Sequence, residues 1–197
     1  MPPEGVRLSE FSNEWYKPGR SRAARLLWLL ISAVFFDTWV PWPSYLKAAV
    51  LRLFGAKIGK GVVLKPHVRI KYPWRLSIGD DCWIGEGVWI DNLAQVSLGN
   101  DVCLSQRCMI ETGNHDWSDP RFGLIVRGVV IADGAWAAVG SLLLPGSRLE
   151  AQAVLGAESV LTHVAEPSGI YLGNPAQKVR MRHLSWPGPD GQRQNRF

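Results

Sequence analysis

An aliphatic or small apolar residue recurs every six residues through the middle of the chain, and this period limits the possible folds. Grouped in threes, the recurring positions are Ile58, Leu64, Ile70; Ile78, Ile84, Ile90; Leu98, Leu104, Ile110; Ile131, Ala137, Leu143; and Leu149, Leu155, Leu161. A period of six fits neither a 3.6-residue helix nor simple strand alternation, and it is typical of a parallel β-helix. Three short strands then form one triangular coil, and coils stack about 4.8 Å apart through parallel ladders. The sequence predicts an all-β fold with about five coils over residues 58–166.

The spacing between coils predicts where extra chain leaves the β-helix. The five coils begin at Ile58, Ile78, Leu98, Ile131 and Leu149, so successive starts differ by 20, 20, 33 and 18 residues. Three hexads require 18, and the surplus always follows the third strand of a coil. The third coil therefore carries a long loop, residues 116–130, with His115 at its root. Long loops held by a rigid scaffold are usually functional.

Charge and cysteine content narrow the possible partners. The net charge of +5 and the pI near 9.3 favour an anionic partner. The basic residues are scattered and match no nucleic-acid-binding module, so no nucleic acid partner is predicted. The three cysteines form no CxxC pair, and Cys82 and Cys108 fall on inward positions of the repeat, which indicates buried thiols. Nothing requires an oxidising compartment, and we expect a cytoplasmic protein.

The first 57 residues precede the repeat. Residues 1–19 read as an irregular lead-in, and 23–36 are apolar except for Arg25 and Ser32. Fourteen helical residues span about 21 Å, short of the roughly 30 Å hydrocarbon core, and no signal-peptide cleavage site follows. Two interpretations stay open: a helix that caps the first coil, or one in the membrane interface with its arginines near lipid headgroups. A second helix is predicted over 44–54, ending at Gly55.

His115 is the candidate general base. It stands at a strand end beneath the long loop, whereas His67, His163 and His183 read as surface or satisfied core residues. A neutral imidazole with a pKa near 6.5 can accept a proton from a hydroxyl group at neutral pH. Asp116, Asp91 or a backbone carbonyl could fix its tautomer, and the sequence does not choose among them.

The repeat, the histidine under a loop and the ending GNPAQKVR resemble the hexapeptide-repeat acyltransferases. More narrowly, WRLSIGDDCWIGEGVWIDNLAQVSLG, GNHDWSDPRF and the two apolar helices are similar to the colanic-acid type of exopolysaccharide O-acetyltransferase, over residues 11–182. The resemblance implies left-handed coils, although crossovers are usually right-handed. It also implies a homotrimer that binds acetyl-CoA as co-substrate between neighbouring prisms, with no metal.

The resemblance and the loop supply a set of candidate site residues. His115 matches the general base, with Asp116 beside it. Contacts with the acceptor sugar are predicted for Asn92, Asn114, Trp117 and Phe122. The cofactor arm is expected at Trp136, Gly140, Ser141, Ala157 and Thr162, and the coenzyme phosphates at Lys178 and Arg180. Residues 167–197 thus form a C-terminal segment that contacts the cofactor through its GNPA stretch and ends in a disordered tail from Leu184.

Three positions depart from the pattern. Ala132 replaces the hexad glycine, Ala137 replaces a large aliphatic residue, and His163 stands where many relatives have lysine. These departures put local coil packing and one phosphate contact in doubt.

The predicted function is acetyl transfer from acetyl-CoA to a sugar hydroxyl in extracellular polysaccharide biosynthesis. The acceptor would be a glycan or lipid-linked oligosaccharide, with peripheral contact at the inner membrane surface. One alternative is a non-enzymatic structural or binding trimer. The other is a metal-dependent enzyme like the γ-carbonic anhydrases, whose zinc needs three converging histidines; His115 has no companion histidine four or five residues away.

Overall fold

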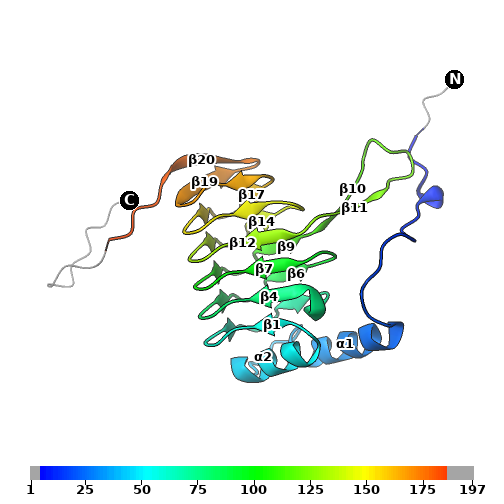
Figure 1. Ribbon diagram of the computed structural model, residues 1–197, viewed down its shortest axis with the longest axis horizontal. Helices are drawn as coiled ribbons and strands as arrows, with labels where there is room; N and C mark the ends of the chain where they lie inside the picture. The colour runs from blue at the N-terminus through cyan, green and yellow to red at the C-terminus, as the bar shows by residue number, and fades with distance from the viewer. Residues whose placement is uncertain (1–4, 186–197) are drawn as a thin grey trace.

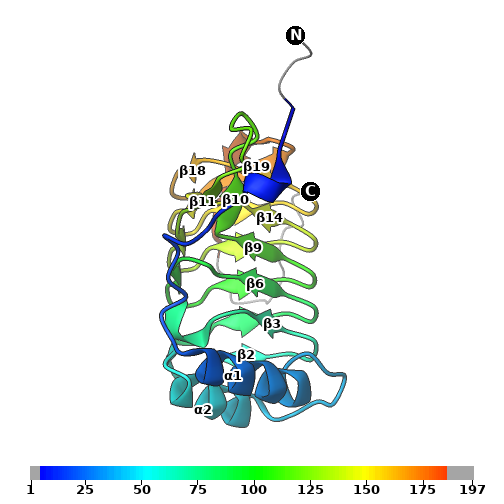
Figure 2. The same cartoon turned by 90° about the vertical axis from the view of Figure 1, so that its right-hand side faces the viewer.

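The computed structural model describes residues 5–185 of the chain. A three-sided prism of stacked coils stands on two helices that lie across one end (Figure 1). These are α1 (Arg22–Phe35) and α2 (Ser44–Leu53), which confirms the two predicted N-terminal helices. Turned by 90°, the coils lie one above another with the helices beneath (Figure 2). Most of the tail predicted to be disordered, from position 186 on, lies outside the described residues.

Each side of the prism is a sheet to which successive coils contribute one short strand. Sheet A contains β1 (Lys57–Ile58), β4 (Leu76–Ile78), β7 (Val96–Leu98), β12 (Val129–Ile131), β15 (Arg148–Leu149) and β18 (Val164–Ala165). Sheet B contains β2 (Val63–Leu64), β5 (Trp83–Ile84), β8 (Cys103–Leu104), β13 (Trp136–Ala137), β16 (Val154–Leu155), β19 (Gly169–Gly173) and the antiparallel β20 (Ala176–Met181). Sheet C contains β3 (Arg69–Ile70), β6 (Trp89–Asp91), β9 (Met109–Glu111), β14 (Leu142–Leu143) and β17 (Val160–Leu161). Outside the prism lie the hairpin β10 (Gly113–His115) and β11 (Leu124–Val126) and the 3-10 helices η1 (Leu8–Glu10) and η2 (Pro73–Arg75).

The recurring apolar residues are the inward-facing residues of these strands. In sheet B, for example, Ile84 pairs with Leu104 and Leu104 with Ala137, and all three are fully buried. Because the same position faces inward in every coil, one continuous hydrophobic column runs through the prism. Cys82 and Cys108 lie in this core as predicted, and burial raises the pKa of the Cys108 thiol to about 12.

The parallel ladders extend one coil further than the sequence predicts. Strands β18 and β19 start a sixth coil, which β20 closes by pairing antiparallel with β19. The inward residue Ala165 follows Leu161 by only four positions instead of six. The hexad phase is therefore lost at this point, although the backbone ladder continues.

The three corners of the prism differ in how much chain they hold. The AB corner consists of residues 59–62, 79–82, 99–102, 132–135, 150–153 and 166–168; the BC corner of 65–68, 85–88, 105–108, 138–141 and 156–159; and the CA corner of 71–75, 92–95, 112–128, 144–147 and 162–163. The AB and BC corners keep nearly constant lengths, so the variation falls at the CA corner. This confirms the predicted corner, and Figure 1 shows the longest insertion, with β10 and β11, projecting from it.

Side chains from the helix pair satisfy the open edge of the first coil. Lys47 donates to the carbonyls of Leu64 and Lys65 in and beside sheet B, at 3.4 and 2.9 Å. Arg52 donates to Ile58 O of sheet A, and Trp28 Nε1 to Ile70 O of sheet C, each in the range 2.9–3.0 Å. The helices thus cap the first coil, as one of the two interpretations requires. No helix within residues 5–185 is long and apolar enough to cross a bilayer.

Glycines at the AB corner allow adjacent coils to approach closely. A Cβ on Gly79 would lie 2.5 Å from the carbonyl oxygen of Gly99 in the next coil and 2.6 Å from Asn100 Oδ1. The same Asn100 oxygen accepts a 2.8 Å hydrogen bond from Asp80 N, so an Asx side chain bridges the coils above each glycine. In the fifth coil Ala151 takes the Asx position. Because no bridging side chain stands there, Ala132 fits where earlier coils have glycine.

We predict that Gly79→Ala destabilises the fold by about 3 kcal/mol, since the neighbouring backbone must move to admit the methyl group. The matched control is Gly87→Ala. Its Cβ would meet nothing closer than the flexible Arg107 side chain at 3.4 Å, so only its positive φ, +70°, opposes the change, at about 1 kcal/mol. Equilibrium urea unfolding of both variants measures the difference; equal losses would contradict the packing argument.

Candidate functional site

A short hairpin holds His115 away from the prism. Strands β10 and β11 pair antiparallel at the CA corner of the third coil, with His115 opposite Leu124 at the outer end of the ladder. The imidazole is partly buried. The loop and histidine therefore lie together at the predicted corner, and the backbone around the histidine is fixed by the pairing.

A backbone carbonyl orients the imidazole. His115 Nδ1 lies 2.8 Å from the carbonyl oxygen of Phe122. Since a carbonyl only accepts hydrogen bonds, Nδ1 carries the proton in the neutral ring and Nε2 bears the lone pair. Among residues 5–185, no hydrogen-bond partner occupies Nε2. Of the three orienting groups left open by the sequence, the structure uses a carbonyl.

Two aromatic rings fix the plane of the imidazole. The Phe122 ring stacks on it with centroids 4.4 Å apart and an interplanar angle of 11°. Phe11 meets it edge-on, with centroids 5.5 Å apart and an angle of 61°. Phe122 was predicted as a platform for sugar, but one face of its ring already contacts the histidine. It positions the imidazole with both its ring and its carbonyl.

Phe11 belongs to the N-terminal strap, residues 5–20, which runs from the helix pair to the hairpin (Figure 1). Tyr16 Oη donates to Leu93 O at 2.8 Å and accepts from Arg75 at 2.7 Å, while Trp74 Nε1 donates to Pro18 O at 2.7 Å. The sequence predicted only an irregular lead-in here. The signal it offered is the group of aromatic residues, 11, 15 and 16, within an otherwise polar segment.

Three other predicted loop residues do not contact the imidazole through their side chains. The Asp116 carboxylate accepts hydrogen bonds from the Ser118 amide and hydroxyl, which hold the pKa of this carboxyl below its usual value. The Asp116 side chain therefore does not orient His115. Asn114 Oδ1 accepts from the His115 amide at 2.8 Å, and Trp117 is 83% exposed at the loop tip.

Asn92, predicted to contact the acceptor sugar, lies inside the CA corner. Alternation along β6 and its extension turns Asp91 outward and Asn92 inward, where it is fully buried. Its Oδ1 accepts from Tyr72 N at 2.8 Å, and its Nδ2 donates to Tyr72 O and Arg75 O at 2.7 and 3.0 Å. With its oxygen and both amide protons engaged in these hydrogen bonds, the Asn92 side chain shapes the CA corner.

The accessible polar groups below His115 form a column at the end of sheet C. Asp91 pairs with Glu111 of the next coil in the ladder, and Lys71 Nζ lies 2.7 Å from Asp91 Oδ1. Burial and the nearby Asp91 carboxylate raise the pKa of Glu111. Outward residues of sheet C therefore form a charged cluster at the coil from which the hairpin departs.

Three predicted cofactor residues gather at the BC corner or beside it. Trp136 points outward from sheet B and donates through Nε1 to Ser105 Oγ at 2.9 Å. Gly140 and Ala157 occupy the BC corner of the fourth and fifth coils. A Cβ on Gly140 would lie 2.1 Å from a Glu158 carboxylate oxygen, so coil packing alone already requires this glycine.

The other predicted cofactor residues lie elsewhere. Ser141 is fully buried, and its hydroxyl donates to Ala138 O at 2.7 Å. Thr162 is exposed at the CA corner, across sheet C from Gly140 and Ala157. Lys178 and Arg180 are exposed on β20, with Lys178 paired to Glu166.

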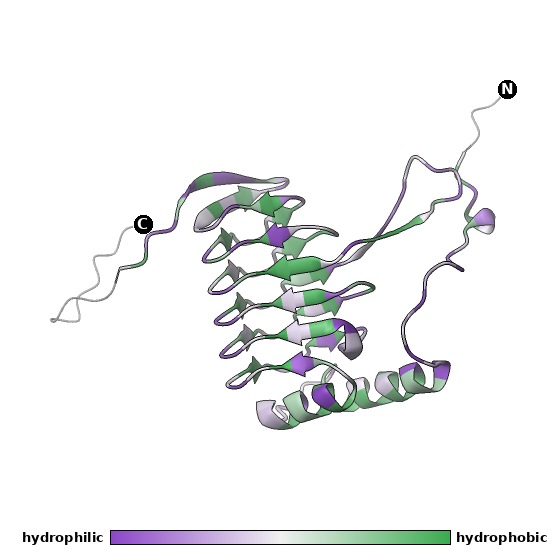
Figure 3. Cartoon of the chain, viewed as in Figure 1, coloured by the Kyte–Doolittle hydropathy of each residue, from purple (hydrophilic) through white to green (hydrophobic). Residues whose placement is uncertain are grey.

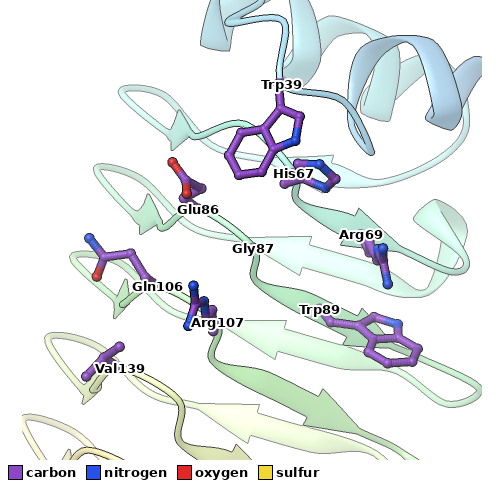
Figure 4. Close-up of a pocket in the computed structure, with 9 residues that line it drawn as sticks. All are labelled: Trp39, His67, Arg69, Glu86, Gly87, Trp89, Gln106, Arg107 and Val139. Carbon is purple, nitrogen blue, oxygen red and sulfur yellow. The ribbon is translucent and has the colours of Figure 1, made fainter.

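A groove of about 490 Å³ follows the BC corner through the first four coils. We call it the BC groove; its main lining residues are Trp39, His67, Arg69, Trp89, Arg107 and Val139 (Figure 4). Asp37 Oδ1 accepts from His67 Nδ1 at 2.9 Å and from Arg69 Nε at 3.1 Å, which orders this wall. The groove ends at Val139, directly before Gly140. No local sequence pattern indicates the BC groove, because its residues come from five separate segments.

The described residues contain no group of three or more His, Cys, Asp or Glu side chains placed to hold a metal ion. His67 lies in the BC groove and His163 at the CA corner of the fifth coil, so neither joins His115 within one chain. One chain therefore supplies no three-histidine zinc site of the kind that the hydratase alternative needs.

Comparison with solved structures identifies the architecture. A hexapeptide-repeat acetyltransferase of Vibrio cholerae aligns with a TM-score of 0.76 at 20% identity, covering 84% of this chain and 96% of that one. A galactoside acetyltransferase solved with coenzyme A aligns with a TM-score of 0.73 at 18% identity, covering 82% of each chain. These likenesses confirm the predicted left-handed parallel β-helix.

Sequence comparison identifies the family, although no protein-family model matches the chain. WcaF of Escherichia coli (strain K12), a protein named for acetyl transfer in colanic acid biosynthesis, is 34% identical over 177 residues, 89% of this chain and 96% of WcaF. Nodulation protein L of Rhizobium meliloti is 28% identical over 124 residues, 61% of this chain and 68% of that protein. The chain therefore belongs to the colanic-acid type of hexapeptide-repeat acetyltransferases.

Proposed function

We propose that the protein transfers an acetyl group from acetyl-CoA to a sugar hydroxyl in extracellular polysaccharide biosynthesis. The observation that carries this proposal is His115, whose Nδ1 is held by the Phe122 carbonyl so that Nε2 can act as a base. Family membership supports acetyl-CoA as the donor, since structural neighbours carry it or coenzyme A. The same membership supports a polysaccharide acceptor, because WcaF is named for colanic acid biosynthesis.

His115 would act first as base and then as acid. Nε2 takes the proton from the acceptor hydroxyl as its oxygen attacks the thioester carbonyl. The resulting oxyanion is stabilised by a backbone N–H donor, and its collapse breaks the carbon–sulfur bond. The imidazolium then returns its proton to the leaving thiolate, which gives an acetyl ester, coenzyme A and a neutral histidine. No covalent acetyl-enzyme is needed.

The site needs a second copy of the chain. His115 and Thr162 lie at the CA corner, whereas Gly140 and Ala157 lie at the BC corner, so sheet C separates the base from most of the cofactor line. Packing the CA corner of one prism against the BC corner of the next brings the two halves together. Repeated head to tail, this contact closes into a ring, and we propose the homotrimer implied by the family.

Outward side chains of sheets B and C support this packing. Trp83 and Trp136 of sheet B and Trp89 of sheet C are partly exposed, and each lies on a face that adjoins the BC corner. The outward residues Lys57, Ser77 and Ser97 of sheet A are polar or charged. Sheets B and C therefore suit contacts between protomers, and sheet A suits solvent.

The BC groove suits a saccharide acceptor. Trp39, 69% exposed, offers an apolar ring face, and Arg69, held by Asp37, and Arg107 offer donors for hydroxyl or carboxylate oxygens. Because the groove ends at Val139, an acceptor lying in it would meet an acetyl group carried past Gly140. We propose a glycan or lipid-linked oligosaccharide as the acceptor, modified on the cytoplasmic side of the membrane.

Replacing the base tests the mechanism. His115→Gln should lower kcat for acetyl transfer about 10²–10⁴-fold, the usual contribution of a general base, with little change in KM for acetyl-CoA. The measurement is release of coenzyme A with a panel of glycan fragments, the product being located by mass spectrometry. His183→Gln, an exposed histidine outside the site, is the control. Equal rates for both variants would remove His115 from the mechanism.

Removing the edge-on ring tests the role of the strap. Phe11→Ala should reduce kcat about tenfold while KM for acetyl-CoA stays constant, because the imidazole loses one of its two supports. Phe11→Leu should restore part of the rate. Trp15→Ala, which changes an exposed aromatic residue nearby in the strap, should leave kcat unchanged. If KM rises and kcat does not fall, Phe11 is not a positioning residue.

Mixed oligomers test the shared site. Homogeneous His115→Gln and Ala157→Trp proteins should both be nearly inactive. If each site combines two protomers, refolding them together in equal amounts should restore about a quarter of wild-type activity, since one interface in four then has both halves intact. No recovery in a mixture shown to contain hybrid trimers would place the whole site within one chain.

A further inference from the structure

The outer face of α1 is apolar and uncovered. Trp28 is buried and Ile31 and Phe35 are partly buried against the first coil, and the opposite side of the helix carries Leu26 and Leu30, which are 59% and 60% exposed. Residues 26 and 30 lie one turn apart, about 160° around the helix from 28 on average. A helix that is apolar all round is normally buried on all sides. In this structure the prism covers only the side of α1 that carries Trp28, Ile31 and Phe35.

The rest of this end of the molecule is similar. We call it the base: α1, α2 and the segment between them. Its exposed large apolar side chains are Leu26, Leu27, Leu29, Leu30, Val34, Trp39, Val40, Tyr45 and Leu53. Figure 3 shows hydrophobic colour along much of the helix pair, which lies across the end of the prism. Contiguous patches of this kind on soluble domains mark docking surfaces.

The charge of the base selects an anionic partner. In and around the base, residues 15–57 contain seven basic side chains and one acidic side chain, Asp37, which is already engaged by His67 and Arg69. Two of the seven, the buried Lys47 and the carbonyl-bound Arg52, cap the first coil, and the other five include Arg20, Arg22 and Arg25. Arg20 and Arg22 flank the start of α1. Apolar residues on one side with arginines at the end and edge are the pattern of a helix that lies in a membrane interface.

A slot between the helices adds a separate observation. It has a volume of about 370 Å³ and lies where α1 begins and α2 ends. Ala24, Leu27, Leu53 and Phe54 supply apolar walls, with Trp74 behind them and Arg20 as the one charged lining residue. An apolar slot with one guanidinium matches a lipid chain that ends in a phosphate.

We propose that the base docks on the surface of an anionic lipid bilayer and that the slot holds one acyl chain, with Arg20 at its phosphate. The 14 residues of α1 cover about 21 Å, so the helix lies along the membrane instead of crossing it. A second copy would bring its own arginines to the same face, which disfavours self-association there. In a trimer of parallel prisms, all three bases would face one plane, and three weak attachments would act together.

The proposed reaction gives this surface a further use. Trp39 belongs to the base and also lines the BC groove. A saccharide attached to a membrane lipid would therefore enter the groove at its membrane end and reach Val139 about three coil spacings, or ~15 Å, above the base. This step rests on the proposed function, whereas membrane docking itself does not.

Flotation with lipid vesicles tests the docking. The full chain should float with vesicles of phosphatidylcholine and phosphatidylglycerol, and much less with phosphatidylcholine alone. Leu26→Gln with Leu30→Gln should weaken vesicle binding at least tenfold, because two exposed leucines lose their apolar contact with lipid. The matched control is Leu8→Gln with Leu184→Gln, two exposed leucines outside the base. Thermal unfolding of both proteins checks that they are folded.

A second pair of variants tests the charge. Arg20→Gln with Arg22→Gln should lower binding to the anionic vesicles about tenfold or more, while Arg121→Gln with Arg148→Gln, equal in charge, should lower it little. Failure of the wild type to float, or equal losses in test and control variants, would overturn the proposal. So would light scattering that shows the leucines of the base mediating association between copies. Acetyl transfer to a soluble glycan fragment is measured in parallel and should be unchanged in the base variants. A failure of the docking proposal can therefore be told apart from a failure of the proposed function.

Discussion

Hydrogen bonds from the two N-terminal helices cap the open edge of the first coil, on which every later coil stacks. A parallel ladder leaves one row of unpaired backbone groups at each end, and buried groups of this kind are costly. The helix pair supplies donors to all three sides: Arg52 to sheet A, Lys47 to sheet B and Trp28 to sheet C. Ser44 Oγ also accepts from Leu64 N at 3.0 Å. Burial lowers the pKa of Lys47, and the Leu64 and Lys65 carbonyls accept the hydrogen bonds that its Nζ donates. The same helices that present an apolar face outward thus begin the stack.

Stacking explains why the long insertion that carries His115 leaves the prism at the CA corner. At the AB corner, Gly79 approaches the next coil so closely that an insertion would break the Asx bridges. The CA corner has no such constraint, and it accommodates both the long hairpin and the shortened link before β18. Additional chain, such as the hairpin that carries His115, can therefore be inserted there without disturbing the ladder. The BC corner keeps a constant length of four residues, and small residues such as Gly140 and Ala157 lie there beside the outward tryptophans of sheet B.

The sequence predicted the features that depend on local repetition. The hexad period identifies the inward residues, the buried Cys82 and Cys108, and the corner from which His115 projects. It loses the sixth coil because Ala165 comes two residues early. Asn92 lies inside and its neighbour Asp91 faces outward, since successive residues of an extended strand point to opposite faces.

Features that depend on chain folding far from the repeat were out of reach. The carbonyl of Phe122 and the ring of Phe11 reach the imidazole only through the turn of the hairpin and the path of the strap. Neither leaves a periodic trace. The BC groove joins residues from position 39 to position 139, and no local pattern connects them. Prediction was therefore strongest for the scaffold and weakest for the groups that hold the base in place.

The strap has a consequence for how the enzyme matures during translation. The hairpin that Phe11 contacts, and whose Pro120 O accepts a hydrogen bond from Arg7 N at 2.7 Å, is made about one hundred residues after the strap. The coils can assemble in order from the helix pair as the chain emerges. The strap must therefore wait for the third coil before it has a place to bind, so the imidazole acquires its full support only after that coil has been synthesised.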